Sequence, residues 1–81
     1  MSSKEEDRKR VNCWLGAAAR AKRIEANVSQ SELADEIGAD QAYVSRMESG
    51  IKPISVSMLL EICKVINTSA AELLQQVERH V

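Results

Sequence analysis

Apolar residues recur every three or four positions along most of the chain, which is the spacing of one face of an α-helix. In the segment 29–50, Leu33, Ala34 and Ile37 share one such face, and Val44 and Met47 share another. The pattern predicts a compact all-α fold whose five helices lie at about residues 7–26, 29–38, 41–50, 56–66 and 70–79. Residues 1–6 are polar and are expected to be a flexible N-terminus, so the folded domain is expected at residues 7–81.

The breaks between these helices carry residues that end or begin a helix. Asn27 and Asn67 lie where helices must end, and asparagine tolerates the left-handed conformation of a helix C-cap. Gly38 is expected to take the same conformation, with Asp40 capping the helix that follows. Two S-x-x-E pairs are expected to form capping boxes: Ser29 with Glu32 and Ser69 with Glu72. A glycine turn between two short capped helices predicts a helix-turn-helix.

The outward face of the expected helix at 41–50 is polar. Opposite Val44 and Met47, one side of this helix carries mostly polar residues and one alanine. These residues are Gln41, Ala42, Ser45, Arg46 and Ser49. Gln, Ser and Arg side chains hydrogen-bond base edges and phosphates in a major groove. A solvated face would be the simpler interpretation of an isolated helix, but the face here belongs to the two-helix unit, which favours DNA recognition.

The same residues resemble a known family, the phage repressor and Cro (Xre-type) helix-turn-helix proteins, over about residues 15–74. The matching elements are LG at Leu15 and Gly16, Arg23, SQSELA at 29–34, Gly38, YVSRMESG ending at Gly50, Pro53, and the apolar run 59–66. The resemblance implies a lambda-repressor-like fold and a sequence-specific transcriptional regulator that binds double-stranded DNA.

The resemblance also implies roles for individual residues. Four are implied to read base edges: Gln41, Ala42, Ser45 and Arg46. Four are implied to contact the DNA backbone: Gln30, Tyr43, Ser49 and Lys52. Asp40 departs from the more usual Ser or Thr, and accepting from a cytosine amino group is an alternative to its capping role. Arg23 and Glu48 are implied to form a structural ion pair, with a phosphate contact by Arg23 as the weaker alternative.

The length and composition predict a small hydrophobic core, so the domain would gain stability if a partner covered more of its apolar surface. The chain has 81 residues, no Phe and one Trp, so burial rests on aliphatic side chains. Once the domain is closed, four apolar side chains of the last two helices are expected to stay partly uncovered: Leu60, Leu74, Val77 and Val81. They predict a homodimer, which would place two recognition helices on an inverted-repeat operator. The alternative is that they fold back under Trp14, leaving a monomer that pairs only on DNA.

The net charge of −1 is unevenly placed along the chain. Residues 1–23 carry seven basic and three acidic side chains, and residues 24–81 carry four basic and nine acidic ones. An acidic protein binds DNA weakly through charge alone, so specific contacts must supply most of the affinity.

Other classes of function find little support in the sequence. Cys13 and Cys63 lack metal or redox spacing, and His80 completes no site, so we expect no metal, no cofactor and no enzyme activity. Cys63 fits an apolar helix face and is expected to be a small buried hydrophobe. Without a signal peptide or a long apolar run, the expected location is the cytoplasm.

The resemblance also narrows the kind of regulator. The chain resembles stand-alone Cro-like repressors and the small controller proteins of restriction-modification systems, and the segment DQAYVSRMESG is similar to the controllers. The alternative from another class is a protein-interaction module, such as an antitoxin that masks a partner enzyme. Such a module would be expected to carry an additional partner-binding segment.

Overall fold

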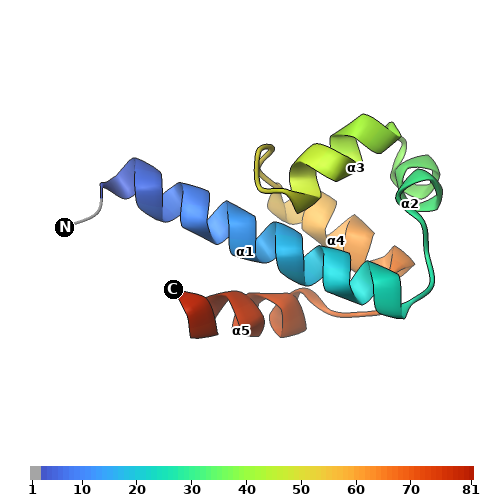
Figure 1. Ribbon diagram of the computed structural model, residues 1–81. Coiled ribbons are helices and arrows are strands. Elements are labelled where there is room, and N and C mark those ends of the chain that lie inside the picture. The colour runs from blue at the N-terminus through green and yellow to red at the C-terminus, as the bar shows by residue number, and fades with distance from the viewer. Residues whose placement is uncertain (1–2) are drawn as a thin grey trace.

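The computed structural model describes residues 3–81, which form five helices and no strand (Figure 1). The helices are α1 (Lys4–Glu25), α2 (Gln30–Ile37), α3 (Gln41–Glu48), α4 (Val56–Val65) and α5 (Ala70–His80). The predicted all-α, five-helix architecture is therefore confirmed. Apart from the start of α1, the predicted ends of the helices agree within about two residues, which is the usual spread between definitions of a helix end.

The start of α1 differs from the prediction. The helix was expected to begin at Asp7, but it begins at Lys4, because the Ser3 hydroxyl accepts a hydrogen bond from the Glu6 backbone N–H at 3.1 Å. Acidic side chains in the first turn also favour this end of the helix dipole. Of the flexible segment expected at residues 1–6, residues 1–2 lie outside the described part of the chain, and Lys4 to Glu6 are helical.

The long helix α1 organises the fold (Figure 1). It packs against α3 on one side and against α5 on the other, while α2 contacts both α3 and α4. The first turns of α1 extend beyond the other helices, which gives the domain its longest dimension of 40 Å. The arrangement leaves the side of α3 that faces away from α1 uncovered.

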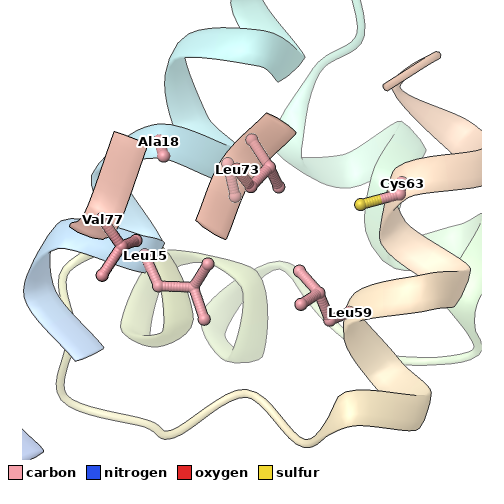
Figure 2. Close-up of a cluster of buried hydrophobic side chains, with 7 residues drawn as sticks. Leu15, Ala18, Leu59, Cys63, Leu73 and Val77 are labelled. Atoms are coloured by element: carbon pink, nitrogen blue, oxygen red, sulfur yellow. The ribbon is translucent and has the colours of Figure 1, made fainter. Parts of the chain in front are cut away.

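Two clusters of buried apolar side chains form the core. Figure 2 shows the first cluster, in which α1, α4 and α5 meet. Its residues are Leu15, Ala18, Ala19, Leu59, Cys63, Leu73 and Val77. The second cluster lies under α2, α3 and α4. Its residues are Leu33, Ala34, Val44, Met47, Ile62 and Ile66. Because α4 supplies side chains to both clusters, it joins the two halves of the domain.

Val77 corrects the predicted dimer surface. It was expected to remain partly uncovered, but it is 4% exposed and packs in the first cluster with Leu15 and Leu73 (Figure 2). The physical reason is that α1 lies alongside α5 and covers the side that Val77 shares with Leu73, four residues before it. Leu60, Leu74 and Val81 are exposed as expected, at 50%, 41% and 56%.

The predicted caps are present, with one change. Asn27 and Asn67 adopt the expected left-handed conformation, with φ values of 59° and 55°. Ser69 caps α5 by accepting from the Glu72 backbone N–H at 3.1 Å, but the Glu72 carboxylate turns mainly to the Thr68 hydroxyl. It also lies 3.9 Å from the Lys22 ammonium on α1. The second capping box is therefore only half formed, because other partners compete for its carboxylate.

Candidate DNA interface

The turn between α2 and α3 is built from local capping. Ser29 and Glu32 form a complete capping box at the start of α2, with both hydrogen bonds at 3.0 Å. Gly38 ends α2 with φ 70°, the left-handed conformation that glycine adopts without steric cost. Asp40 then starts α3 by accepting from the Tyr43 backbone N–H at 2.8 Å. These caps fix the direction in which α3 leaves the turn, and they give the Asp40 carboxylate a structural role.

Helix α3 divides into a buried and an exposed side as the sequence predicted. Val44 and Met47 are fully buried in the second core cluster. The predicted base-reading residues are all exposed: Gln41, Ala42, Ser45 and Arg46. Although the Gln41 amide also contacts α2, all four side chains remain exposed, so this face is available to a partner.

The end of α3 is held tightly against α1 at Gly16. A Cβ atom at this position would lie 2.4 Å from the Met47 carbonyl oxygen and 2.6 Å from that of Glu48, closer than real Cβ contacts allow. Only glycine permits this approach of the two backbones. In the sequence, only the family resemblance points to Gly16, since the contact joins it to residues far along the chain, Met47 and Glu48.

A buried ion pair makes the second connection between α1 and α3. The Arg23 guanidinium donates to both carboxylate oxygens of Glu48, at 2.7 and 3.0 Å, and also to the Val28 carbonyl oxygen at 2.9 Å. Arg23 is 8% exposed and Glu48 is 6% exposed. The structure therefore shows the ion pair and the burial of both side chains. These bonds use three of the five N–H donors of Arg23, and burial of the side chain leaves the other two little access to a phosphate.

The residues predicted to contact the DNA backbone differ in their surroundings. Tyr43 is partly buried against the second core cluster, whereas Ser49 and Lys52 are exposed. The connector after α3 turns sharply at Gly50, with φ 84°, and the backbone N–H groups of Ile51 and Lys52 both donate to the Arg46 carbonyl oxygen. These bonds bring the backbone of Lys52 to the end of α3.

Gln30 has partners that the sequence analysis missed. Its side-chain amide donates to the Glu48 carboxylate at 3.0 Å and accepts from the Gln41 amide at 3.4 Å. Gln30 lies at the start of α2 and Gln41 at the start of α3, so the turn brings the two glutamines together. No local pattern signals the contact, because it depends on the angle between the two helices.

Within residues 3–81, no group of three or more His, Cys, Asp or Glu side chains could hold a metal ion. Cys63 is buried in the first cluster, where burial raises the pKa of its thiol and disfavours the reactive thiolate. Cys13 is exposed on α1. No helix in the described part of the chain is long and apolar enough to cross a membrane.

Helix α3 is the second helix of a tight two-helix unit. One side of it is polar and exposed, and the other side is held against α1 by the Arg23–Glu48 ion pair and the contact at Gly16. This is the geometry of a DNA-binding helix-turn-helix. Comparison with known proteins agrees. The chain belongs to the helix-turn-helix family of DNA-binding transcriptional regulators, whose model matches residues 20–73.

The chain is similar to curated regulators and to solved structures. It is 34% identical over 55 residues to the uncharacterised HTH-type transcriptional regulator Rv0474 of Mycobacterium tuberculosis, over 68% of this chain and 39% of that protein. This chain thus matches about two fifths of that relative's length. It is also 31% identical to the clp gene regulator ClgR of Corynebacterium glutamicum, with a TM-score of 0.80 over 84% of this chain and 87% of that one.

A restriction-modification controller protein shares the fold. A mutant form of the controller C.Esp1396I superposes with a TM-score of 0.74 over 86% of this chain and 93% of that one, at 20% identity. At this level of identity the likeness shows the fold alone. It supports the lambda-repressor-like architecture predicted from the sequence.

Proposed function

We propose that this protein binds a specific inverted-repeat operator as a homodimer and regulates transcription there, in the manner of a Cro-like repressor or a restriction-modification controller. The proposal rests on the exposed polar face of α3. The opposite side of this helix is fixed against α1 by the close contact at Gly16 and by the Arg23–Glu48 ion pair. A rigid helix presents its side chains to a groove without first having to order them.

Each exposed residue of α3 suits a particular part of the DNA. Arg46 carries the planar fork that bonds guanine through two acceptors, Gln41 can bond adenine, and Ala42 can touch a thymine methyl group. Ser45 supplies a small hydroxyl between them. The backbone contacts are assigned to residues around this face: Gln30, Tyr43, Ser49 and Lys52. Backbone contacts set the position of the helix, and base contacts select the sequence.

The proposal is tested by selecting duplexes from a random library and then titrating the enriched operator and a scrambled duplex at fixed salt. We expect an inverted repeat to be enriched. Arg46→Ala should lose roughly 1 to 3 kcal/mol on the operator and relax the preference at one base pair. Arg79→Ala, which removes an exposed arginine side chain from α5, is the matched control. If no sequence is enriched, specific DNA binding is refuted, and the protein-interaction module becomes the better hypothesis.

The proposed dimer surface is the exposed side of α5 with the neighbouring part of α4. Leu74 in α5 and Val81 directly after the helix are seven positions apart, close to two helical turns, so they lie on one side. Leu60 is an exposed apolar side chain of α4. Figure 1 shows α5 and α3 on opposite sides of α1, so this interface would leave the recognition helix uncovered. Two-fold pairing would then present two copies of α3 to half-sites roughly 34 Å apart.

The dimer is tested by sedimentation of the free protein at micromolar concentration. Leu74→Asp should make it monomeric without loss of helix content, because the side chain is 41% exposed in the monomer. Gln75→Asp places the same charge on an adjacent exposed position and should remain dimeric. Val77→Asp is unsuitable, because it would bury a charge in the core. A wild-type monomer under these conditions would refute a preformed dimer.

A further inference from the structure

A groove of about 370 Å³ lies between the first half of α1 and the connector that follows α3. Its lining residues are Lys9, Asn12, Cys13, Ser49, Gly50 and Ile51. Figure 1 shows the first turns of α1 extending beyond this connector. The groove therefore adjoins the end of the recognition helix, but its α1 side is built from residues that precede the matched family segment.

The floor of the groove is formed by Cys13 and Gly50, where the backbones of α1 and the connector are in close contact. A Cβ atom at Gly50 would lie 2.7 Å from both the Cα and the Sγ atom of Cys13. The Cys13 thiol also donates to the Ser49 carbonyl oxygen at 3.9 Å. These contacts fix the separation of the two walls, so a ligand would not have to order them on binding.

Lys9 lies on the side of α1 that faces α3 and the connector. It precedes Gly16 by seven residues, about two helical turns, so the two residues share one side of the helix. Its ammonium lies 3.7 Å from the Glu5 carboxylate, with the two side chains 72% and 79% exposed. An ion pair this exposed contributes little in water, so Lys9 can exchange Glu5 for another anion at low cost.

The other residues of the groove suit a DNA strand. Asn12 is partly buried, and its side-chain amide forms no hydrogen bond to another group of residues 3–81, so its donors are available. Ile51, on the connector, is 76% exposed. Lys9 carries the one charge among the lining residues, so the groove has a cationic polar edge and an apolar edge. A DNA backbone alternates anionic phosphates with largely apolar sugar faces and matches both edges.

We propose that this groove holds a phosphate of the DNA backbone, with Lys9 and Asn12 as donors and Ile51 packed against the adjoining sugar. The inference rests on the proposed function and extends the DNA contacts to the first half of α1. Ser49, already assigned to the DNA backbone, lines the same groove. A phosphate held here would fix the position of the C-terminal end of α3, while the bases are read along the helix.

The first test compares Lys9→Met with Arg10→Met. Arg10 is the adjacent exposed cation of α1 and points about 100° away around the helix. Lys9→Met should weaken operator binding by the dimer about tenfold, or about threefold per protomer. It should also make the fall of log affinity with log salt shallower by about one unit of slope per protomer. Arg10→Met should weaken binding by less than about twofold.

Neutral methylphosphonate linkages, placed one at a time in the operator, locate the contact. One linkage in each half-site should weaken binding by the wild-type protein and by Arg10→Met, but not by Lys9→Met, which has already lost this contact. Asn12→Ala should weaken binding less than Lys9→Met and leave the salt dependence unchanged, because it removes a neutral donor. Urea unfolding should show all three variants to be as stable as the wild-type protein.

Glu5→Gln provides a variant with the opposite effect. It frees Lys9 from its exposed ion pair and removes a carboxylate from beside the proposed phosphate, so operator affinity should rise about twofold per protomer. Glu78→Gln, which removes an exposed carboxylate from α5, is the control for the change in net charge. An equal rise in both variants would show a general charge effect and would count against the groove.

Three further outcomes would overturn the proposal. Lys9→Met and Arg10→Met weaken binding equally, as expected of diffuse positive charge; or every methylphosphonate that affects the wild-type protein affects Lys9→Met to the same extent; or Lys9→Met changes the sedimentation of the free protein, which would assign the groove to a second copy of the chain. Each leaves the proposed function intact, since the wild-type protein would still select its operator. If the wild-type protein binds DNA without sequence preference, the proposed function fails, while the salt dependence of Lys9→Met on a random duplex still decides whether the groove holds a phosphate.

Discussion

The ion pair between Arg23 and Glu48 makes a strong prediction about stability. Replacing Arg23 by Met keeps much of the side-chain volume but leaves the carboxylate of Glu48 buried, with the Gln30 amide as its remaining side-chain partner. Removing one member of a buried pair costs about 3 to 5 kcal/mol, because the other charge stays out of water without compensation. We therefore expect Arg23→Met to be among the most destabilising single substitutions in the chain.

The size of this loss is large compared with the total stability. A domain of 81 residues is expected to have a free energy of unfolding of roughly 4 to 12 kcal/mol. The single variant should therefore lose from about a quarter of that stability to all of it. Replacing Glu48 by Met as well removes the unpaired charge, so the double variant Arg23→Met/Glu48→Met should be more stable than Arg23→Met.

Urea unfolding followed by circular dichroism measures these free energies, with the slope checked to be unchanged. Arg79→Met, on the exposed part of α5, is the control for loss of a surface arginine and should change stability by less than about 0.5 kcal/mol. A loss below about 1 kcal/mol in Arg23→Met, or a double variant less stable than that single variant, would refute the argument.

Three further predictions concern Lys52, Gly16 and Glu72. Lys52→Ala should make the fall of log affinity with log salt shallower by about one unit of slope per protomer. An unchanged slope would remove Lys52 from the proposed phosphate contacts. Gly16→Ala should destabilise the fold in urea despite a gain of up to about 1 kcal/mol in helix propensity, since its Cβ would lie 2.4 Å from the Met47 carbonyl oxygen, and equal or higher stability would contradict this. The Thr68 hydroxyl holds the pKa of Glu72 below its ordinary value of 4.5, so the stabilisation is present above that pH and is lost as the pH falls through the lowered pKa. Thermal unfolding from about pH 6 to about pH 3 should show a smaller decline in Thr68→Val, and equal declines would show that this bond contributes nothing.

The local features of the fold could be predicted from the sequence because they depend on neighbouring residues. Helical periodicity located the five helices, and the asparagine and glycine stops lie where the backbone takes the left-handed conformation. The two sides of α3 also follow from periodicity, since residues three and four apart share one side of a helix. The exposed face proposed to meet DNA was therefore visible before the tertiary structure.

Contacts between distant segments were decided only by the tertiary structure. Val77 belongs to the core because α1 covers it, and the Glu72 carboxylate gains a distant partner in Lys22 on α1. The hydrogen bonds from Gln30 to Glu48 and Gln41 likewise require α2 and α3 to meet at a particular angle. The sequence by itself determined where helices begin, end and divide into polar and apolar sides, because these depend on residues within a turn or two. Their packing determined which side chains are buried and which partner each polar group takes, because a side chain bonds to whatever the fold brings within about 3 Å of it.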